Sequence, residues 1–201
     1  MRLAVVGAGG HAKVVVATAQ ACGYEVVGLY DDDPTKAEAT VLGVPVRGRV
    51  AEVAGAGCPV VFAIGDNRSR KSLGASLDLP LATLVHPAAV VHESVEIGGG
   101  TVIFAGVVVQ PGARLGHHVI LNTGTTVDHD CELGDWVHCA PGSHLAGRVT
   151  VGEGALLGVG SAVIPDLRIG AWAVLGAGST AVEDVADGVR VGGVPARPLS
   201  R

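Results

Sequence analysis

The sequence predicts two domains: a small α/β domain of the Rossmann-like βαβ type over residues 1–85, and a parallel β-helix over residues 86–201. The α/β domain is indicated by a strand, a glycine-rich loop, a helix and a second strand within the first 30 residues. The β-helix is indicated by an aliphatic residue that recurs every six residues from Val91 to Leu175. Since neither an α-helix nor a flat strand has a period of six, this hexapeptide repeat is typical of a β-helix.

The N-terminal domain places its candidate binding residues at one edge of a sheet. Apolar runs at residues 2–6, 25–30 and 60–64 predict buried parallel strands, and helices are expected over about 11–21 and 68–77. Ligands of such sheets bind beyond the carboxyl ends of the strands. The loops at these ends carry Gly9, Gly10, His11, Asp31, Asp32 and Gly65.

The glycine loop nearly matches a dinucleotide-binding fingerprint. Gly7, Gly9 and Ala12 fill its three small positions, and Asp31 and Asp32 follow about twenty residues on. A domain of about 85 residues is too short for the complete doubly wound sheet. We therefore favour a nucleotide-sugar over NAD, with a phosphate at the helix N-terminus and the ribose or base at the acidic loop. The alternative is a tight turn without a ligand.

The hexapeptide repeat predicts a triangular prism in which three units close one coil of eighteen residues. Of the fifteen repeat positions from Val91 to Leu175, fourteen are Val, Ile or Leu, and the exception is Cys139. The residue four positions later is also small or β-branched, with Leu167 the one large residue. Glycines recur directly after the aliphatic residue, and we expect them to provide unusual backbone angles at corners. They are residues 98, 116, 134, 152, 158, 170 and 176.

Composition limits the classes of partner and compartment. The net charge of −5 argues against non-specific binding to nucleic acid. The four cysteines form no CxxC pair and no zinc-type spacing, which predicts reduced thiols in a cytoplasmic protein. The apolar run at residues 2–6 is interrupted by Gly7 and is too short for a membrane span, so no membrane partner is expected.

His129 is the strongest candidate for a catalytic residue, because it lies between Asp128 and Asp130. A neighbouring carboxylate holds an imidazole in one tautomer and suits it to act as a general base. His138 follows nine residues later, which is half a coil, so the two histidines lie on different sides of one prism. If both serve one site, that site is formed between protomers, as in a trimer with parallel prism axes. Cys131 is near His129 in sequence, but its phase directs it inward.

Five motifs together resemble a known family, the bacterial sugar-nucleotide acetyltransferases of the left-handed β-helix type. This family includes amino-sugar N-acetyltransferases and sialic acid O-acetyltransferases, and the resemblance covers the whole chain. The motifs are Gly7-Ala8-Gly9-Gly10-His11, Asp31-Asp32, Ala63-Ile64-Gly65, Leu121-Asn122-Thr123 leading to His129-Asp130-Cys131, and Val191-Gly192-Gly193-Val194-Pro195-Ala196-Arg197. The charged Asp66 after the third motif is a departure, since an uncharged residue also occurs there in relatives.

The resemblance implies an enzyme that transfers the acetyl group of acetyl-CoA to the amine of a nucleotide-linked amino sugar of the 4-amino-4,6-dideoxy type. It implies a homotrimer that uses no metal, with a left-handed prism. His129 would be the base, and Asp130 would raise its basicity. The nucleotide-sugar would be held by Gly9, Gly10, His11, Asp31, Asp32 and Gly65. The acetyl-CoA cleft would be lined by His138, Val159 and Ala177.

Three other functions stay open at this point. O-acetylation of a sugar such as sialic acid would use the same base and donor. A β-helix carbonic anhydrase would hold zinc with three histidines, but His117 and His129 are twelve residues apart and so lie on different faces. A sugar-nucleotide sensor without catalytic activity would not need the His129–Asp130 pair.

Overall fold

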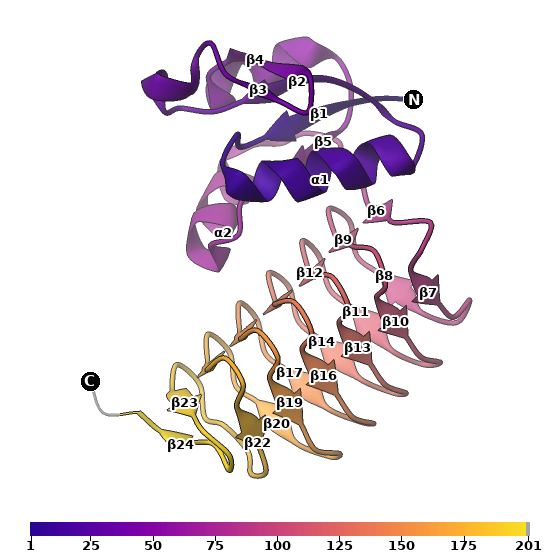
Figure 1. The fold of residues 1–201 in the computed structure, drawn as a ribbon, viewed down its shortest axis with the longest axis vertical. Helices are drawn as coiled ribbons and strands as arrows, with labels where there is room; N and C mark the ends of the chain where they lie inside the picture. Colours follow the sequence, from indigo (N-terminus) through magenta and orange to yellow (C-terminus); the bar gives the residue numbers. More distant parts are fainter. Residues whose placement is uncertain (200–201) are drawn as a thin grey trace. The chain divides into compact units, whose positions relative to one another are not determined.

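The computed structural model describes residues 1–199 and divides the chain into two compact units, Met1–Pro87 and Ala88–Arg201. The sequence-based boundary lay between residues 85 and 86. Figure 1 shows the helices within the first unit and the stacked short strands of the second. None of the helices within residues 1–199 is long and apolar enough to cross a membrane.

Unit 1 is an α/β domain with a central sheet in the order β3-β4-β2-β1-β5. β1 pairs in parallel with β2 and β5, as a βαβ unit requires, while β3 and β4 form an antiparallel hairpin. The elements are β1 (Arg2–Val6), α1 (Gly10–Ala21), β2 (Glu25–Tyr30), η1 (Pro34–Lys36), β3 (Thr40–Val41), β4 (Val44–Gly48), η2 (Val50–Ala56), β5 (Val60–Phe62), α2 (Asn67–Ser76) and β6 (Leu84–Val85).

The three strands and two helices expected from the sequence are present, with small differences at their ends. The predicted strand 60–64 is shorter, because β5 ends at Phe62 and the chain then enters a loop. The helix predicted over 68–77 begins one residue earlier, since Asp66 is its N-cap and accepts a hydrogen bond from Ser69 N–H at 2.8 Å. The β3–β4 hairpin and η2 were not predicted.

The core of unit 1 explains why β1 is apolar from Leu3 to Val6. Ala4 and Val6 pack with Val50 and Val53 of η2 on one face of the sheet. The alternate residue Val5 is fully buried on the opposite face, where α1 contacts β1. A strand covered on both faces reads as a continuous apolar run, and its carboxyl end is held rigidly.

Unit 2 is a left-handed parallel β-helix whose short strands stack into three faces. Each face is named here after one of its strands: the β13 face (β22-β19-β16-β13-β10-β7), the β14 face (β20-β17-β14-β11-β8) and the β15 face, which runs from β9 through β12, β15, β18 and β21 to β23 and β24. The strands are β7 (Val90–Val91), β8 (Glu96–Ile97), β9 (Val102–Ile103), β10 (Val108–Val109), β11 (Arg114–Leu115), β12 (Ile120–Leu121), β13 (Thr126–Val127), β14 (Glu132–Leu133), β15 (His138–Cys139), β16 (His144–Leu145), β17 (Thr150–Val151), β18 (Leu156–Leu157), β19 (Ala162–Val163), β20 (Arg168–Ile169), β21 (Val174–Leu175), β22 (Thr180–Ala181), β23 (Arg190–Gly192) and β24 (Arg197–Pro198).

The eighteen-residue coil is confirmed by the strand register. Val109 pairs with Val127, and Leu115 pairs with Leu133, so that residues eighteen apart are neighbours on adjacent coils. The aliphatic repeat residues from Ile103 to Leu175 are buried along the axis, while Val91 and Ile97 at the first coil are only partly buried. The small residues four positions later, such as Val119 and Val137, are buried with them, so both sets of side chains fill the prism.

The repeated glycines were expected to provide unusual backbone angles, and this reason is wrong. Gly98, Gly116, Gly134 and their equivalents do not have positive φ; a side chain there would collide with the next coil, as a Cβ on Gly134 would lie 2.9 Å from Glu153 N. Positive φ occurs instead three residues after the aliphatic residue, where corners also use Trp136 and Asp130. Close approach of the coils, and not backbone angle, selects the predicted glycines.

Candidate active site

A cavity of about 400 Å³ in unit 1 brings together all six residues predicted to bind the nucleotide-sugar. It lies at the carboxyl ends of β1, β2 and β5, where the glycine loop, the acidic loop and the loop after β5 meet. Its lining consists of Gly9, Gly10, His11, Asp31, Asp32 and Gly65 with Gly7, Lys36, Val50, Ala63, Ile64 and Leu73.

Two different physical reasons account for the glycines at residues 7, 9 and 10 of this loop. Gly7 has a φ of +103°, and a Cβ on it would lie 3.0 Å from Ala63 O, so the fold itself requires glycine there. Gly9 and Gly10 have no atom within 4 Å of a Cβ position. The protein interior does not need these two glycines, which leaves room for a ligand close to the backbone at the N-terminus of α1.

Asp31 holds the glycine loop in place. Its carboxylate accepts hydrogen bonds from Ala8 N–H at 2.7 Å, from Asp33 N–H at 3.0 Å and from the Lys36 ammonium at 3.0 Å. Partial burial raises the pKa of Asp31, but these donors outweigh it and the net shift is downward. Asp32 is more open: its side chain is 53% exposed, and one oxygen accepts from Val50 N–H at 3.1 Å.

His11 is neutral at physiological pH. Burial, and then the charge of Arg70, lower its pKa to about 4. The Arg70 guanidinium is itself buried and donates to Ile64 O at 2.9 Å and to Asn67 Oδ1 at 2.9 Å. Arg70 thus fixes the loop after β5, which lines the cavity together with the glycine loop.

A second cavity of about 460 Å³ adjoins the first, because Asp31 and Asp32 line both. Its other residues come from η1 and the residues flanking it, from β4, and from the N-cap of η2, and they include Pro34, Arg47 and Arg49. Together the two cavities form one extended hollow within unit 1.

On the prism, His129 and Asp130 form a hydrogen-bonded pair at the corner after β13. The distance between His129 Nδ1 and Asp130 Oδ2 is 2.9 Å, and Asp128 Oδ1 accepts from His129 N–H at 2.7 Å. With Nδ1–H donating to the carboxylate, Nε2 carries the lone pair and can accept a proton. Asp130 has a φ of 58°, so this residue sits at a left-handed corner. Cys131 is fully buried, in accord with its predicted inward phase.

An ion pair flanks the dyad on the following coils. Arg148 donates to both oxygens of Asp166, with Nε–Oδ1 at 2.6 Å and Nη2–Oδ2 at 2.8 Å. The hydrogen bond from Arg148 lowers the pKa of Asp166. The corner therefore presents carboxylate, guanidinium and carboxylate in sequence from Asp130 to Asp166.

The residues predicted to line the acetyl-CoA cleft lie on another side of the prism. His138 is in β15, with its Nε2 3.4 Å from Asn122 Nδ2. Val159 and Ala177 are exposed and occupy the same corner on adjacent coils, after β18 and β21. Gly160 and Gly178 follow them with positive φ and no atom within 4 Å of a Cβ position, which leaves this edge smooth. Gly158, by contrast, is required for stacking, because its Cβ would lie 2.6 Å from Ala177 N.

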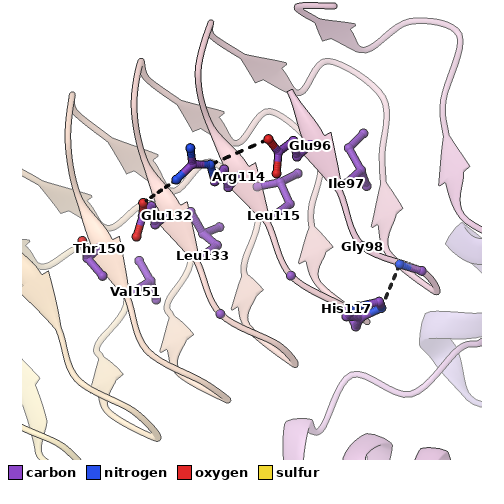
Figure 2. Close-up of a pocket in the computed structure, with 13 residues that line it drawn as sticks. Glu96, Ile97, Gly98, Arg114, Leu115, His117, Glu132, Leu133, Thr150 and Val151 are labelled. Atoms are coloured by element: carbon purple, nitrogen blue, oxygen red, sulfur yellow. Dashed lines mark hydrogen bonds and ion pairs between the residues drawn. The ribbon is translucent and has the colours of Figure 1, made fainter. Parts of the chain in front are cut away.

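The outer surface of the β14 face is charged and lies apart from these residues. Figure 2 shows Glu96, Arg114 and Glu132 on three adjacent strands, with Arg114 3.1 Å from Glu132 and 3.9 Å from Glu96. An open hollow of about 690 Å³ runs over this face, and its lining includes no predicted site residue. Within residues 1–199, no group of three or more His, Cys, Asp or Glu side chains is arranged to hold a metal ion.

Sequence reasoning missed Lys36, Arg70 and Arg148. Lys36 could have been found, because it follows Asp31 by five residues and can fold back on it within a short turn. Arg70 gave no signal, since a cation on an otherwise polar helix reads as exposed. Arg148 could have been paired with Asp166 from the eighteen-residue spacing alone.

Both units of the chain resemble known proteins. Residues 2–77 match the family model of the PglD N-terminal domain. A search of curated proteins found no match. Among solved structures, perosamine N-acetyltransferase from Caulobacter crescentus, in complex with CoA and GDP-perosamine, is 43% identical with a TM-score of 0.94, covering 100% of this chain and 98% of that chain.

Two further structures give the same result. The acetyltransferase domain of PglB from Neisseria gonorrhoeae, in complex with acetyl coenzyme A, is 40% identical with a TM-score of 0.92 and covers 98% of each chain. WeeI from Acinetobacter baumannii is 27% identical with a TM-score of 0.88, covering 99% of this chain and 100% of that chain. The identities and the near-complete coverage show that this chain belongs to the sugar-nucleotide acetyltransferases of the hexapeptide-repeat, left-handed β-helix family.

Proposed function

We propose that this protein transfers the acetyl group of acetyl-CoA to the amine of a nucleotide-linked amino sugar of the 4-amino-4,6-dideoxy type, with His129 as the general base. The observation that carries the proposal is the 2.9 Å contact between His129 Nδ1 and Asp130, which leaves Nε2 to accept a proton. The 43% identity to a perosamine N-acetyltransferase supports the reaction class.

The chemistry follows from what each group can do. The neutral amine attacks the thioester carbonyl, and a C–N bond forms as His129 Nε2 takes the amine proton. The Asp130 carboxylate stabilises the imidazolium that results. The C–S bond then breaks, and the proton passes to the thiolate, which leaves as the CoA thiol. This direct transfer needs no acyl-enzyme, and burial of Cys131 raises the pKa of its thiol and disfavours a role as nucleophile.

The nucleotide-sugar is assigned to the cavities of unit 1. Gly9 and Gly10 leave the N–H groups at the start of α1 accessible to a diphosphate. Lys36 and the helix end supply positive potential, and Asp32 keeps an oxygen for the ribose or base. The neutral imidazole of His11 and the small Gly65 complete this assignment, in which Asp31 holds the loop.

Acetyl-CoA is assigned to the smooth edge formed by Val159 and Ala177, with His138 on the neighbouring strand face. Small side chains let a pantetheine arm lie near the backbone. Because acetyl-CoA is a cytoplasmic metabolite and the four cysteines are free thiols, we also propose that the enzyme works in the cytoplasm.

The active unit is proposed to be a homotrimer. His129 follows β13 and His138 lies in β15, so one prism presents them on different sides. A neighbouring protomer can supply the second member of each site. The β13 face suits such an interface, because its outward residues are Val90, Val108, Thr126, His144, Ala162 and Thr180, whereas the β14 face carries Glu96, Arg114, Glu132 and Arg168.

A thiol-release assay with acetyl-CoA and a panel of UDP-, GDP- and dTDP-linked 4-amino sugars tests the proposal. His129→Ala should lower turnover by roughly 10²–10⁴, while His92→Ala, an exposed corner histidine bonded to Ser94, should leave it unchanged. Release with hydroxyl sugars in place of amino sugars would instead assign O-acetylation. Full activity of His129→Ala would remove His129 from the mechanism.

A further inference from the structure

The imidazole of His129 lies against Gly147, its neighbour one coil further along the prism. The two coils are joined here by a hydrogen bond from Arg148 N–H to His129 O at 2.9 Å. A Cβ built on Gly147 would lie 2.5 Å from His129 Nε2 and 2.6 Å from Cε1. The nearest atoms to that Cβ position all belong to the imidazole ring.

We propose that Gly147 is a positioning residue for the general base: the missing side chain keeps the space in which His129 Nε2 faces the substrate amine. The proposal rests on the proposed function of His129. Nε2 is the atom left open when Nδ1–H donates to Asp130, so the space at Gly147 adjoins the atom that takes the proton.

Backbone conformation does not account for this glycine. Gly147 is absent from the positive-φ residues of the prism, so no left-handed φ selects against an alanine there. Gly112, on the coil before the dyad, differs: it has a φ of +75°, and its Cβ would also lie 2.5 Å from Asp130 Oδ1. Gly147 therefore offers a substitution whose contact with the dyad can be tested separately from backbone strain.

The consequence of adding a methyl group is a displaced ring and an intact fold. The atoms in conflict are the far end of a side chain that is 46% exposed, so the ring can swing away at little cost in stability. Swinging lengthens the Nδ1–Asp130 contact and moves Nε2. A displacement of about 1 Å in a catalytic group can lower the rate by about 10²-fold.

The test uses Gly147→Ala and Gly147→Val, His129→Ala, and the double variant Gly147→Ala/His129→Ala. Pro165→Ala, at the same corner position one coil further, is the matched control. Turnover, the KM for each substrate and the thermal unfolding midpoint are measured for every protein. We expect Gly147→Ala to lower kcat about 10- to 100-fold, Gly147→Val to lower it further, and both KM values and the midpoint to stay near wild type.

The double variant separates positioning from a general structural effect. If Gly147 acts through the His129 ring, Gly147→Ala should not lower kcat any further once His129 has been replaced by alanine. Three results would overturn the proposal. Gly147→Ala could keep wild-type kcat, it could lower kcat equally with and without His129, or it could lower the unfolding midpoint enough to explain the lower kcat. Failure of the proposed function looks different, because His129→Ala itself would then retain turnover.

Discussion

Replacing Asp130 with Asn removes the charge that stabilises protonated His129 while changing little else. The amide oxygen of Asn can still accept from Nδ1–H, so the tautomer is preserved. Asn also tolerates the left-handed corner, where Asp130 has a φ of 58°. Asp130→Asn therefore isolates the electrostatic part of the interaction, whereas Asp130→Ala removes the hydrogen bond as well.

The expected magnitude follows from distance and exposure. Opposite charges about 4 Å apart attract by about 1 kcal/mol in water and about 4 kcal/mol at an effective dielectric constant near 20. The side chains of His129 and Asp130 are 46% and 63% exposed, so solvent screening places the effect at the lower end. A loss of about 1–2 kcal/mol of transition-state stabilisation lowers kcat by roughly 5- to 30-fold.

The assay is thiol release at saturating concentrations of both substrates, with circular dichroism to check folding. Asp130→Ala should lose more activity than Asp130→Asn. Asp184→Asn, an exposed carboxylate beyond β22 that accepts from Arg168 N–H at 2.8 Å, serves as the control and should keep wild-type kcat. An Asp130→Asn enzyme with unchanged kcat would refute the role given to the carboxylate.

The remaining predictions concern the two binding regions and the buried histidine. Asp32→Ala should raise the KM for the nucleotide-sugar only, and Ala177→Phe should raise the KM for acetyl-CoA only. Steady-state kinetics measure both constants, and a rise in the same KM for both variants would contradict the division of roles. The pKa of His11 is lowered from 6.5 to about 4, so as the pH falls the unfolded chain takes up this proton before the folded chain does. The free energy of unfolding should therefore fall by up to about 3 kcal/mol between pH 6.5 and pH 4. Urea unfolding across this range checks it, and His11→Gln should reduce the slope.

The prism was predictable because one physical condition repeats along it. Each coil must place an aliphatic side chain on the axis, and stacking by parallel pairing then fixes a register of eighteen residues. The hairpin of β3 and β4 could not be predicted in the same way. It is short, it contains Pro45, and its alternation is too brief to distinguish it from a loop.

The lining of the unit 1 cavity could be predicted where the fold itself does not demand the residue type. Gly9, Gly10 and Gly65 line the cavity although no protein atom lies near their Cβ positions, and their role in binding stays a prediction. Residues that hold another part of the site in place were harder to recognise from the sequence. Asp31 was expected to contact a ligand and lines the cavity, and its carboxylate also accepts hydrogen bonds from Ala8, Asp33 and Lys36, which the sequence did not reveal.

The stacking of coils also explains how little freedom the backbone has at the corner that carries His129 and Asp130. Asp130 N–H donates to Pro111 O at 3.1 Å on the preceding coil, and His129 O accepts from Arg148 N–H at 2.9 Å on the following one. The backbone of the dyad is thus tied on both sides, and only the side-chain torsions of His129 can vary. Asp130 fixes one end of the ring, and the space at Gly147 decides where the other end rests. The ring of His129, the proposed base, is therefore bounded by the adjacent Asp130 and by Gly147 one coil away, and a reading of adjacent residues does not detect the second of these.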